Sequence, residues 1–433
     1  MANALDPHAA VVVGATGAQP TAPLTTADGR PLARALARSS ARARRRAFLL
    51  VLPLLAFILI TFVVPIGQML HRSMYNAGFS DHMPLTSAWF QDNPPGTQPD
   101  EAAYAALAAD LKAAAENRTV GIVGTRMNYD VPGTRSLFTA TGRKVRDGFE
   151  PPFKEALIAA DPKWENPTLW RAMRNASTAY TGNFYLAAVD RTRDDEGNIT
   201  MVPAQQQVYV MLFKRTLWLS LLITFTTFVL GFPIAHLLAT LPTRQSNLLM
   251  ILVLLPFWTS LLVRTTAWMV LLQQQGVIND ILTWLGVIGP DGRLQMIYNQ
   301  TGTIIAMTHI LLPFMILPLY SVMRTINPSY VRAARSLGAS SWTAFRRVYF
   351  PQTLPGLGAG ALLVFILAVG YYITPALVGG SSGQLISNMI AMHMTETLNW
   401  SMAAALAALL LGGVLALYWV YDRLVGIDNL KLG

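Results

Sequence analysis

Residues 332–355 read RAARSLGASSWTAFRRVYFPQTLP, a basic amphipathic stretch between two strongly apolar runs. Ala333 and Ala334 are small enough to let a helix pack closely against a neighbour. Gly338 can end or turn that helix without the steric penalty of a Cβ atom. The pattern therefore predicts a short helix that turns at Gly338.

The second half of this stretch predicts a second helical piece. Phe345 and Val348 continue an apolar face at helical spacing, and Pro351 stops the element before the next apolar run. A bent pair of helices of this kind can fit into a groove on a soluble partner. The candidate residues for such a contact are Arg332, Ala333, Ala334, Gly338, Ala339, Phe345, Val348 and Pro351.

Composition indicates a membrane protein, because 53% of the residues are hydrophobic and only 13% are charged. The formal net charge of +10 is uneven, since residues 71–208 carry 14 basic and 16 acidic side chains. The basic excess therefore belongs to the apolar part. Arginines beside a span follow the positive-inside rule, so we expect a lipid bilayer and no nucleic acid as partner. Cysteine is absent, which excludes disulfides and thiolate metal sites.

The fold class expected is an all-α membrane protein with about six transmembrane helices. Apolar windows long enough to cross a bilayer lie at 47–70, 217–238, 248–272, 302–323, 357–378 and 402–424. The arginines that precede the first window and those of loop 324–356 are predicted to face the cytoplasm. Loops 273–301 and 379–401 contain Asp280 and Glu396 and are predicted to face outward. Both termini are then cytoplasmic.

Residues 71–208 predict a domain of a different kind, inserted outside the membrane between the first and second helices. They mix polar, aromatic and charged residues, and 102–115 has helical composition. Residues 1–46 predict a cytoplasmic, disordered basic tail, and 425–433 a second cytoplasmic tail. The apolar membrane core is predicted at 209–424. We expect no metal site and no catalytic residue in the chain.

Arg264 is a candidate for function because a charge inside an apolar span is costly unless it is paired or solvated. An equally good interpretation is that Arg264 ties neighbouring helices together. Prolines and glycines recur within the spans, and broken helices at membrane depth are tolerated where they line a cavity. The candidate pathway residues are Trp258, Arg264, Trp268, Tyr371 and Tyr372.

Several motifs, in order, resemble the permease subunits of type I ABC importers of the spermidine/putrescine branch. The motifs are 332–355, which resembles the EAA loop of these permeases, and PFWTSLLVRTTAWMVLL (256–272), GVINDILTWLGV (276–287), GYYITPALVGG (370–380) and NWSMAAALAALLL (399–411). Arg332 stands where that loop begins with Glu, and Tyr371 and Ala376 stand where polyamine-moving relatives carry acids. The insertion 71–208 is also longer than the family pattern.

The resemblance implies a non-catalytic permease subunit of the bacterial inner membrane. No phosphate loop of the GxxxxGK[ST] type is present, so ATP and Mg would be bound by partner ATPase subunits. The other partners implied are an extracytoplasmic substrate-binding protein and a second permease subunit, different or identical. Residues 332–351 would be the ATPase-coupling loop.

The resemblance favours a polyamine as cargo, whereas Arg264 favours a zwitterionic or anionic, amino-acid-like or opine-like solute. A secondary transporter is a further alternative, but such proteins show internal repeats and membrane-embedded acidic residues. A membrane enzyme is another, but it would need a paired set of catalytic side chains. Neither pattern is visible in the spans.

Overall fold

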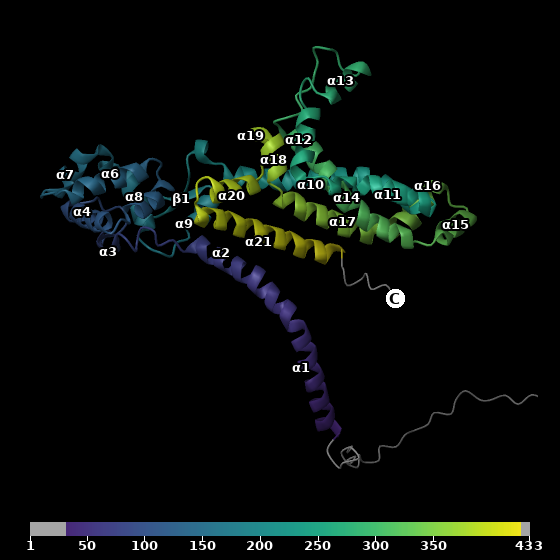
Figure 1. The fold of residues 1–433 in the computed structure, drawn as a ribbon, viewed down its shortest axis with the longest axis horizontal. Coiled ribbons are helices and arrows are strands. Elements are labelled where there is room, and N and C mark those ends of the chain that lie inside the picture. Colours follow the sequence, from purple (N-terminus) through teal and green to yellow (C-terminus); the bar gives the residue numbers. More distant parts are fainter. Residues whose placement is uncertain (1–31, 426–433) are drawn as a thin grey trace, which may run out of the picture. The chain divides into compact units, whose positions relative to one another are not determined.

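The computed structural model describes residues 32–425 and divides the chain into two units, 1–68 and 69–433. The fold is helical, with one short β-hairpin in the described residues (Figure 1). The expected disorder of residues 1–31 lies outside the described residues, as does the tail 426–433. The prediction of disorder was wrong for residues 32–46, because helix α1 (Leu32–Ile58) begins at Leu32. Alanine and arginine favour helix strongly, and they dominate this stretch.

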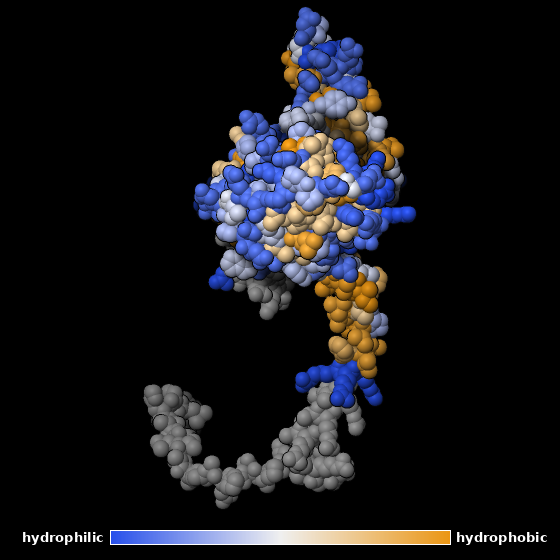
Figure 2. All heavy atoms as spheres, turned by 90° about the vertical axis from the view of Figure 1, so that its left-hand side faces the viewer, coloured by the Kyte–Doolittle hydropathy of each residue, from blue (hydrophilic) through white to orange (hydrophobic). Residues whose placement is uncertain are grey.

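The first apolar helix continues from α1 through the π-turn η1 (Leu59–Val63) into α2 (Val64–Met74). Pro65 explains the wider turn, because it lacks an N–H and its ring would clash with the carbonyl four residues earlier. The N–H of Val64 donates instead to the carbonyl of Leu59, five residues back. Apolar side chains coat this segment (Figure 2), so its composition suits a lipid environment.

Residues 71–208 fold as a helical insertion with its own hydrophobic core. Tyr104, Phe138 and Trp164 are fully buried in this core and pack with Trp170. The elements are α3 (Pro84–Asp92), α4 (Glu101–Glu116), α5 (Val120–Asn128), α6 (Thr134–Arg146), α7 (Phe153–Ala160), η2 (Pro162–Glu165), α8 (Pro167–Ala176), α9 (Asn183–Ala188), and the hairpin β1 (Arg191–Arg193) with β2 (Ile199–Met201). The helix expected at 102–115 is therefore confirmed by α4.

A buried carboxylate holds two helices of the insertion together. Asp110 of α4 accepts hydrogen bonds from the backbone N–H groups of Leu85 and Thr86 at the start of α3, at 3.2 and 2.7 Å. The hydroxyl of Thr86 also donates to it at 2.8 Å. Burial raises the pKa of Asp110, and these hydrogen bonds offset part of that effect. The carboxylate of Asp110 therefore caps the first turn of α3.

Three long helices form the centre of the second unit: α10 (Tyr209–Thr240), α14 (Gln300–Thr325) and α17 (Phe350–Gly370) lie side by side (Figure 1). Their shared core is apolar and includes Leu219, Met315 and Val364. Gly231 and Gly360 allow close approach, because a Cβ on either would lie within 3.2 Å of Met315 atoms. The last long helix is α21 (Trp400–Val425), which packs against α20 (Ile386–Thr395) and α9.

The described residues contain five helices long and apolar enough to cross a membrane, or six if one bent pair counts as a span. The bent pair is α11 (Thr243–Trp258) with α12 (Leu261–Leu271), which meet at 98°. About six spans were expected, and the window predicted at 248–272 corresponds to this bent pair. The loops predicted at 273–301 and 379–401 also contain short helices, α13 (Val277–Trp284), α19 (Gly380–Gly383) and α20, and α18 (Ile373–Val378) forms the end of the span predicted at 357–378.

Candidate functional site: a glycine turn and an arginine-held helix break

The predicted helix–turn–helix is present at 328–349. Helix α15 (Pro328–Ser336) begins at Asn327, whose side chain accepts a hydrogen bond from the N–H of Ser329 at 2.9 Å. It ends at Gly338, which has a φ of +89°. The N–H of Gly338 donates to the carbonyl of Arg335 and the N–H of Ala339 to that of Ala334, at 3.0 and 3.1 Å. These two bonds form a Schellman motif, which requires a left-handed residue at Gly338.

The second piece consists of α16 (Ser341–Ala344) and the π-turn η4 (Phe345–Tyr349), which lead directly into α17. Pro351 produces the π-turn as Pro65 does in the first helix: the N–H of Phe350 donates to the carbonyl of Phe345. Pro351 was expected to stop the element, and that expectation was wrong. A proline at the start of a helix leaves α17 intact because that position needs no N–H partner.

A row of stacked aromatic rings leads from this surface into the helix core. Trp342 stacks on Phe345, and Phe345 stacks on Tyr349, with ring centroids 5.7 and 5.8 Å apart. Trp342 is exposed, whereas Tyr349 is buried and its hydroxyl lies 3.0 Å from Nδ1 of His236 in α10. The spacing of aromatics by three and four residues could have revealed this row in the sequence.

The eight residues predicted to form the ATPase-coupling loop differ in burial. Ala334, Ala339, Phe345 and Val348 are half-buried, and Phe345 packs against the core of α10, α14 and α17. Arg332, Ala333, Gly338 and Pro351 are exposed. Ala333 was expected to pack closely, and within this chain it does not. Its exposure leaves it on the outer surface of α15.

The interruption between α11 and α12 is the second unusual feature. Thr259 and Ser260 are extended, so the last carbonyls of α11 lose their intrahelical partners. Arg264 supplies replacements: its Nη2 donates to the carbonyls of Pro256 and Thr259, the latter at 3.0 Å. Its Nε lies 3.4 Å from the hydroxyl of Thr259. A cation at a helix C-terminus also interacts favourably with the helix dipole.

None of the four ion pairs in the described part of the chain involves Arg264. The charge of this half-buried side chain is therefore balanced by backbone carbonyls and not by a carboxylate. The sequence left two interpretations of Arg264 open, a cargo contact or a contact between neighbouring helices. The geometry favours the second, because Arg264 of α12 is hydrogen-bonded to the end of α11. Pro256 and Thr259 are the partners that sequence reasoning missed. Their position five and eight residues before an intramembrane arginine, with a proline among them, is the signal that could have pointed to them.

The other pathway candidates lie around this break but do not form one cluster. Trp268 donates from Nε1 to Nδ1 of His309 in α14 at 3.1 Å. The backbone carbonyls of Tyr371 and Tyr372 accept hydrogen bonds from Ser387 and Asn388 of α20. Trp258 is 72% exposed. Tyr371 and Tyr372 therefore hold α20 through their backbone, and within residues 32–425 Trp268 is the one aromatic of this set whose side chain is hydrogen-bonded to a side chain of another long helix.

An apolar cavity of about 360 Å³ lies between α10, α11 and α14. Pro256 and His309 contribute to its wall, together with Leu and Ile side chains such as Leu238 and Ile316. None of the five candidate pathway residues lines this cavity. The cavity and the predicted pathway are therefore different places in the fold.

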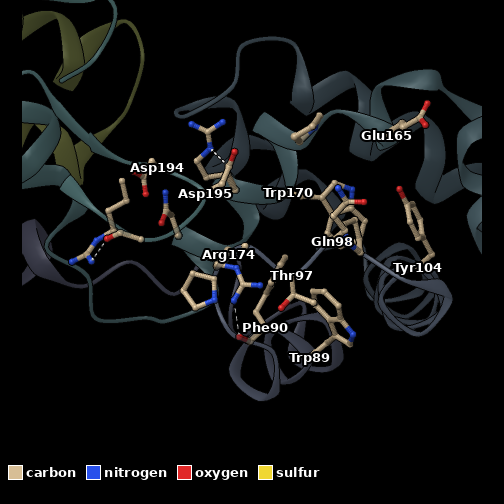
Figure 3. Close-up of a pocket in the computed structure, with 18 of the residues that line it drawn as sticks. Trp89, Phe90, Thr97, Gln98, Tyr104, Glu165, Trp170, Arg174, Asp194 and Asp195 are labelled. Carbon is tan, nitrogen blue, oxygen red and sulfur yellow. Dashed lines mark hydrogen bonds and ion pairs between the residues drawn. The ribbon is translucent and has the colours of Figure 1, made fainter. Parts of the chain in front are cut away.

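The insertion contains a larger cleft, of about 740 Å³ (Figure 3). Trp89, Phe90 and Trp170 form its apolar wall, and charged side chains from α8 and the hairpin surround them. Arg171 pairs with Asp195 at 2.7 Å, and Arg174 donates to the carbonyls of Phe90 and Asn93. Burial raises the pKa of Tyr104 at the other end of the cleft. The two α8 arginines thus hold the surrounding loops in place.

Comparison with known proteins identifies the family. Residues 216–425 match the family described as "Binding-protein-dependent transport system inner membrane component". The spermidine/putrescine transport system permease protein PotB of Escherichia coli K12 is 35% identical over 244 residues, which cover 54% of this chain and 88% of PotB. The chain belongs to this family. It is the membrane-spanning permease subunit of an ABC importer, a multi-pass protein of the inner membrane.

Two further matches were found. The inner membrane ABC transporter permease protein YdcU of Escherichia coli K12 is 32% identical over 49% of this chain and 70% of YdcU. A solved bacterial ABC transporter involved in the import of the acidic polysaccharide alginate has a TM-score of 0.44 and 15% identity, over 71% of this chain and 99% of that chain. The insertion 71–208 lies outside the residues that match the family.

Proposed function

We propose that this permease moves a polyamine such as putrescine or spermidine into the cytoplasm. The observation that carries the proposal is the 35% identity to PotB over 88% of that protein. Aromatic side chains near the helix break can attract an ammonium group through their ring faces, by roughly 0.5–2 kcal/mol each. Trp258 and Tyr372 are exposed and available for such contacts.

The competing proposal was a zwitterionic or anionic cargo held by Arg264. The donors of Arg264 point to the carbonyls of Pro256 and Thr259, which removes the reason for giving it an anionic partner. Titration calorimetry of the cognate binding protein with putrescine, spermidine and a panel of zwitterions tests the cargo. We expect heat with a polyamine. Binding of an acidic compound with no heat from any polyamine would reverse the assignment.

We also propose that the chain is non-catalytic and takes its energy from partner ATPase subunits that bind ATP and Mg. Residues Arg332 to Pro351 would receive the ATPase stroke, and a second permease subunit and an extracytoplasmic binding protein would complete the importer. Closure of the ATPase pair would act as a rigid-body switch on α15 and α16. The aromatic row from Trp342 to Tyr349 offers a packed route from that surface to α10.

The proposed topology has both termini in the cytoplasm and the insertion outside, in contact with the binding protein or as a cap over the pathway. The cysteine-free sequence allows a direct test. A cysteine at exposed Asp147 should react with an impermeant thiol reagent in cells whose outer barrier has been removed. A cysteine at Ser40 should be protected. Reaction at Ser40 with protection at Asp147 would invert the topology.

A further inference from the structure

The cleft in the insertion has an aromatic wall whose polar hydrogens are already used. The indole N–H of Trp170 donates to the carbonyl of Trp164 at 2.7 Å, and the hydroxyl of Tyr104 donates to the same carbonyl at 3.2 Å. Trp89 packs edge to face on Trp170, with ring centroids 6.3 Å apart. Trp170 and Tyr104 therefore offer the cleft ring surface and no free donor.

Arg174 lines the same cleft and has no carboxylate partner (Figure 3). Its Nη1 donates to the carbonyls of Phe90 and Asn93 at 3.0 and 2.7 Å, whereas its Nε and Nη2 have no acceptor within residues 32–425. None of the four ion pairs in that part of the chain involves it. The side chain is half-buried, and burial lowers the pKa of Arg174. A carboxylate that accepts from Nε and Nη2 together would offset this cost of burial.

The cleft is poorly suited to a cation such as a polyamine. Two of its rings already carry cations of the chain, since the Arg174 guanidinium lies 4.9 Å from the ring centroid of Phe90, and Nζ of Lys154 lies 6.0 Å from that of Tyr104. The charged lining contains more basic than acidic side chains: Lys154, Arg171, Arg174 and Arg193 against Glu165, Asp194 and Asp195. An added amine would therefore meet net positive charge and ring faces that are already in use.

Helix α8 holds both sides of the cleft in place. Arg174 fixes the end of α3 through the two carbonyls, and Arg171 fixes the hairpin through its ion pair with Asp195 at 2.7 Å. A site that is formed before binding loses little conformational freedom when a ligand enters. The volume of about 740 Å³ also lies within the range of small-molecule sites, roughly 300–1,000 Å³.

We propose that this cleft binds a small organic acid in which a carboxylate is attached to a ring, as in aromatic acids and sugar acids. The ring would lie against Trp89 and Trp170, and the carboxylate would accept hydrogen bonds from Nε and Nη2 of Arg174. A neutral ring would leave Arg174 without an anion, and an acid without a ring would leave the aromatic wall uncovered. The insertion lies outside the residues that match the family, so this site is separate from the permease core and independent of the proposed cargo.

The first experiment is titration calorimetry of the full-length permease in nanodiscs, with empty nanodiscs subtracted. Phenylacetate is compared with 2-phenylethanol, and D-glucuronate with D-glucose, so that each acid has a neutral analogue. We expect saturable binding of at least one acid and at least tenfold weaker binding of its analogue, and the acid that binds identifies the aromatic or the sugar class. Saturable binding of neither acid, or equal binding of acid and analogue, would overturn the proposal.

The second experiment assigns the binding to Arg174. Arg174→Gln should lower the affinity for the acid about tenfold or more and should remove the difference between the acid and its neutral analogue. Arg143→Gln is the matched control, because Arg143 is an exposed arginine of α6 that does not line the cleft, and it should bind as the wild type does. Wild-type affinity in Arg174→Gln would place the ligand elsewhere and overturn the proposal.

Trp89→Leu tests the same cleft without removing a hydrogen bond, whereas Arg174 also holds the end of α3. We expect several-fold weaker binding of the acid, with its preference over the neutral analogue retained because Arg174 is still present. Wild-type affinity in Trp89→Leu would contradict the stacked ring. Putrescine is titrated in parallel, and saturable putrescine binding that Trp89→Leu weakens would make the cleft a cation site and overturn the assignment to an acid.

Discussion

The molecule interrupts its helices in two places by opposite means, and the two interruptions differ in what replaces the lost backbone hydrogen bonds. At Gly338 the chain reverses through a left-handed glycine, and backbone N–H groups satisfy the freed carbonyls of α15. At Thr259 the chain becomes extended, and the side chain of Arg264 satisfies the freed carbonyls of α11. Both helices restart at a serine, Ser340 and Ser260.

The difference follows from the surroundings that each interruption is expected to have. A turn in water can leave a carbonyl to the solvent, so a glycine suffices. A break within an apolar span has no water to rely on, and each unpaired carbonyl there is costly. An arginine supplies several donors from one position, and carbonyl dipoles in turn stabilise its charge. The arginine and the break therefore require each other.

The largest expected effect comes from removing the side chain that holds the Thr259 break. Arg264→Met leaves the carbonyl of Thr259 without its charged donor, at a cost of about 1–3 kcal/mol for an unsatisfied group. We expect a lower melting temperature of the purified protein and loss of transport. Arg264→Lys keeps the charge without the planar fork and should fall in between. Thermal unfolding in nanodiscs with uptake into proteoliposomes measures both.

Arg324 provides the matched control for this prediction. Its Nη1 donates to the carbonyl of Ala239 at the end of α10 and its Nη2 to the hydroxyl of Thr243, both at 3.2 Å, but it is exposed. Water can replace it, so Arg324→Met should cost much less than Arg264→Met. Equal losses in the two variants would show that solvent access does not distinguish these helix ends.

The second prediction concerns the Gly338 turn. A Cβ at Gly338 meets no atom within 4 Å, so the only obstacle to substitution is its φ of +89°. Gly338→Val should leave the protein inserted but reduce transport and stimulated ATP hydrolysis, because a β-branched residue is strained in this conformation. Gly338→Asn should retain most activity, since asparagine tolerates left-handed φ values. ATPase stimulation of the valine variant equal to wild type would contradict the role of the turn.

The sequence was sufficient to predict the Gly338 turn because its determinants are local. Glycine is the residue that adopts a positive φ at little cost, and the helix before it has an Asn–Pro start and an amphipathic pattern. The insertion as a separate polar region, and its helix at 102–115, could likewise be predicted from composition. What composition could not give was the hydrogen-bonding of Asp110 with α3 or the aromatic packing of Trp164, since both join segments far apart in the chain.

The position of the Thr259 break could not be predicted, because the contacts that hold it, from Arg264 to the carbonyls of Pro256 and Thr259, leave no strong pattern in the sequence. The stretch 248–272 contains no glycine and only one proline, and its apolar character is continuous. An arginine in such a run fits a cargo site as well as a helix clamp. Only the positions of the Pro256 and Thr259 carbonyls distinguish the two. The length of the apolar windows identified the spans, but it could not locate the bend, because the apolar character continues through it.

The smallest expected effect compares the two serines that restart the helices. The hydroxyl of Ser260 accepts a hydrogen bond from the N–H of Val263, and that of Ser340 from the N–H of Thr343, both at 3.2 Å. Ser340→Ala should cost about 1 kcal/mol, a typical value for loss of a helix cap where water is present. Ser260→Ala should cost more, because no water replaces the lost acceptor within the bilayer. The midpoint shifts of the two variants in chemical denaturation of the nanodisc-embedded protein measure the difference. A Ser340→Ala shift equal to or larger than that of Ser260→Ala would place the Thr259 break in contact with water, and Arg264 would then again be available to a solute in the pathway.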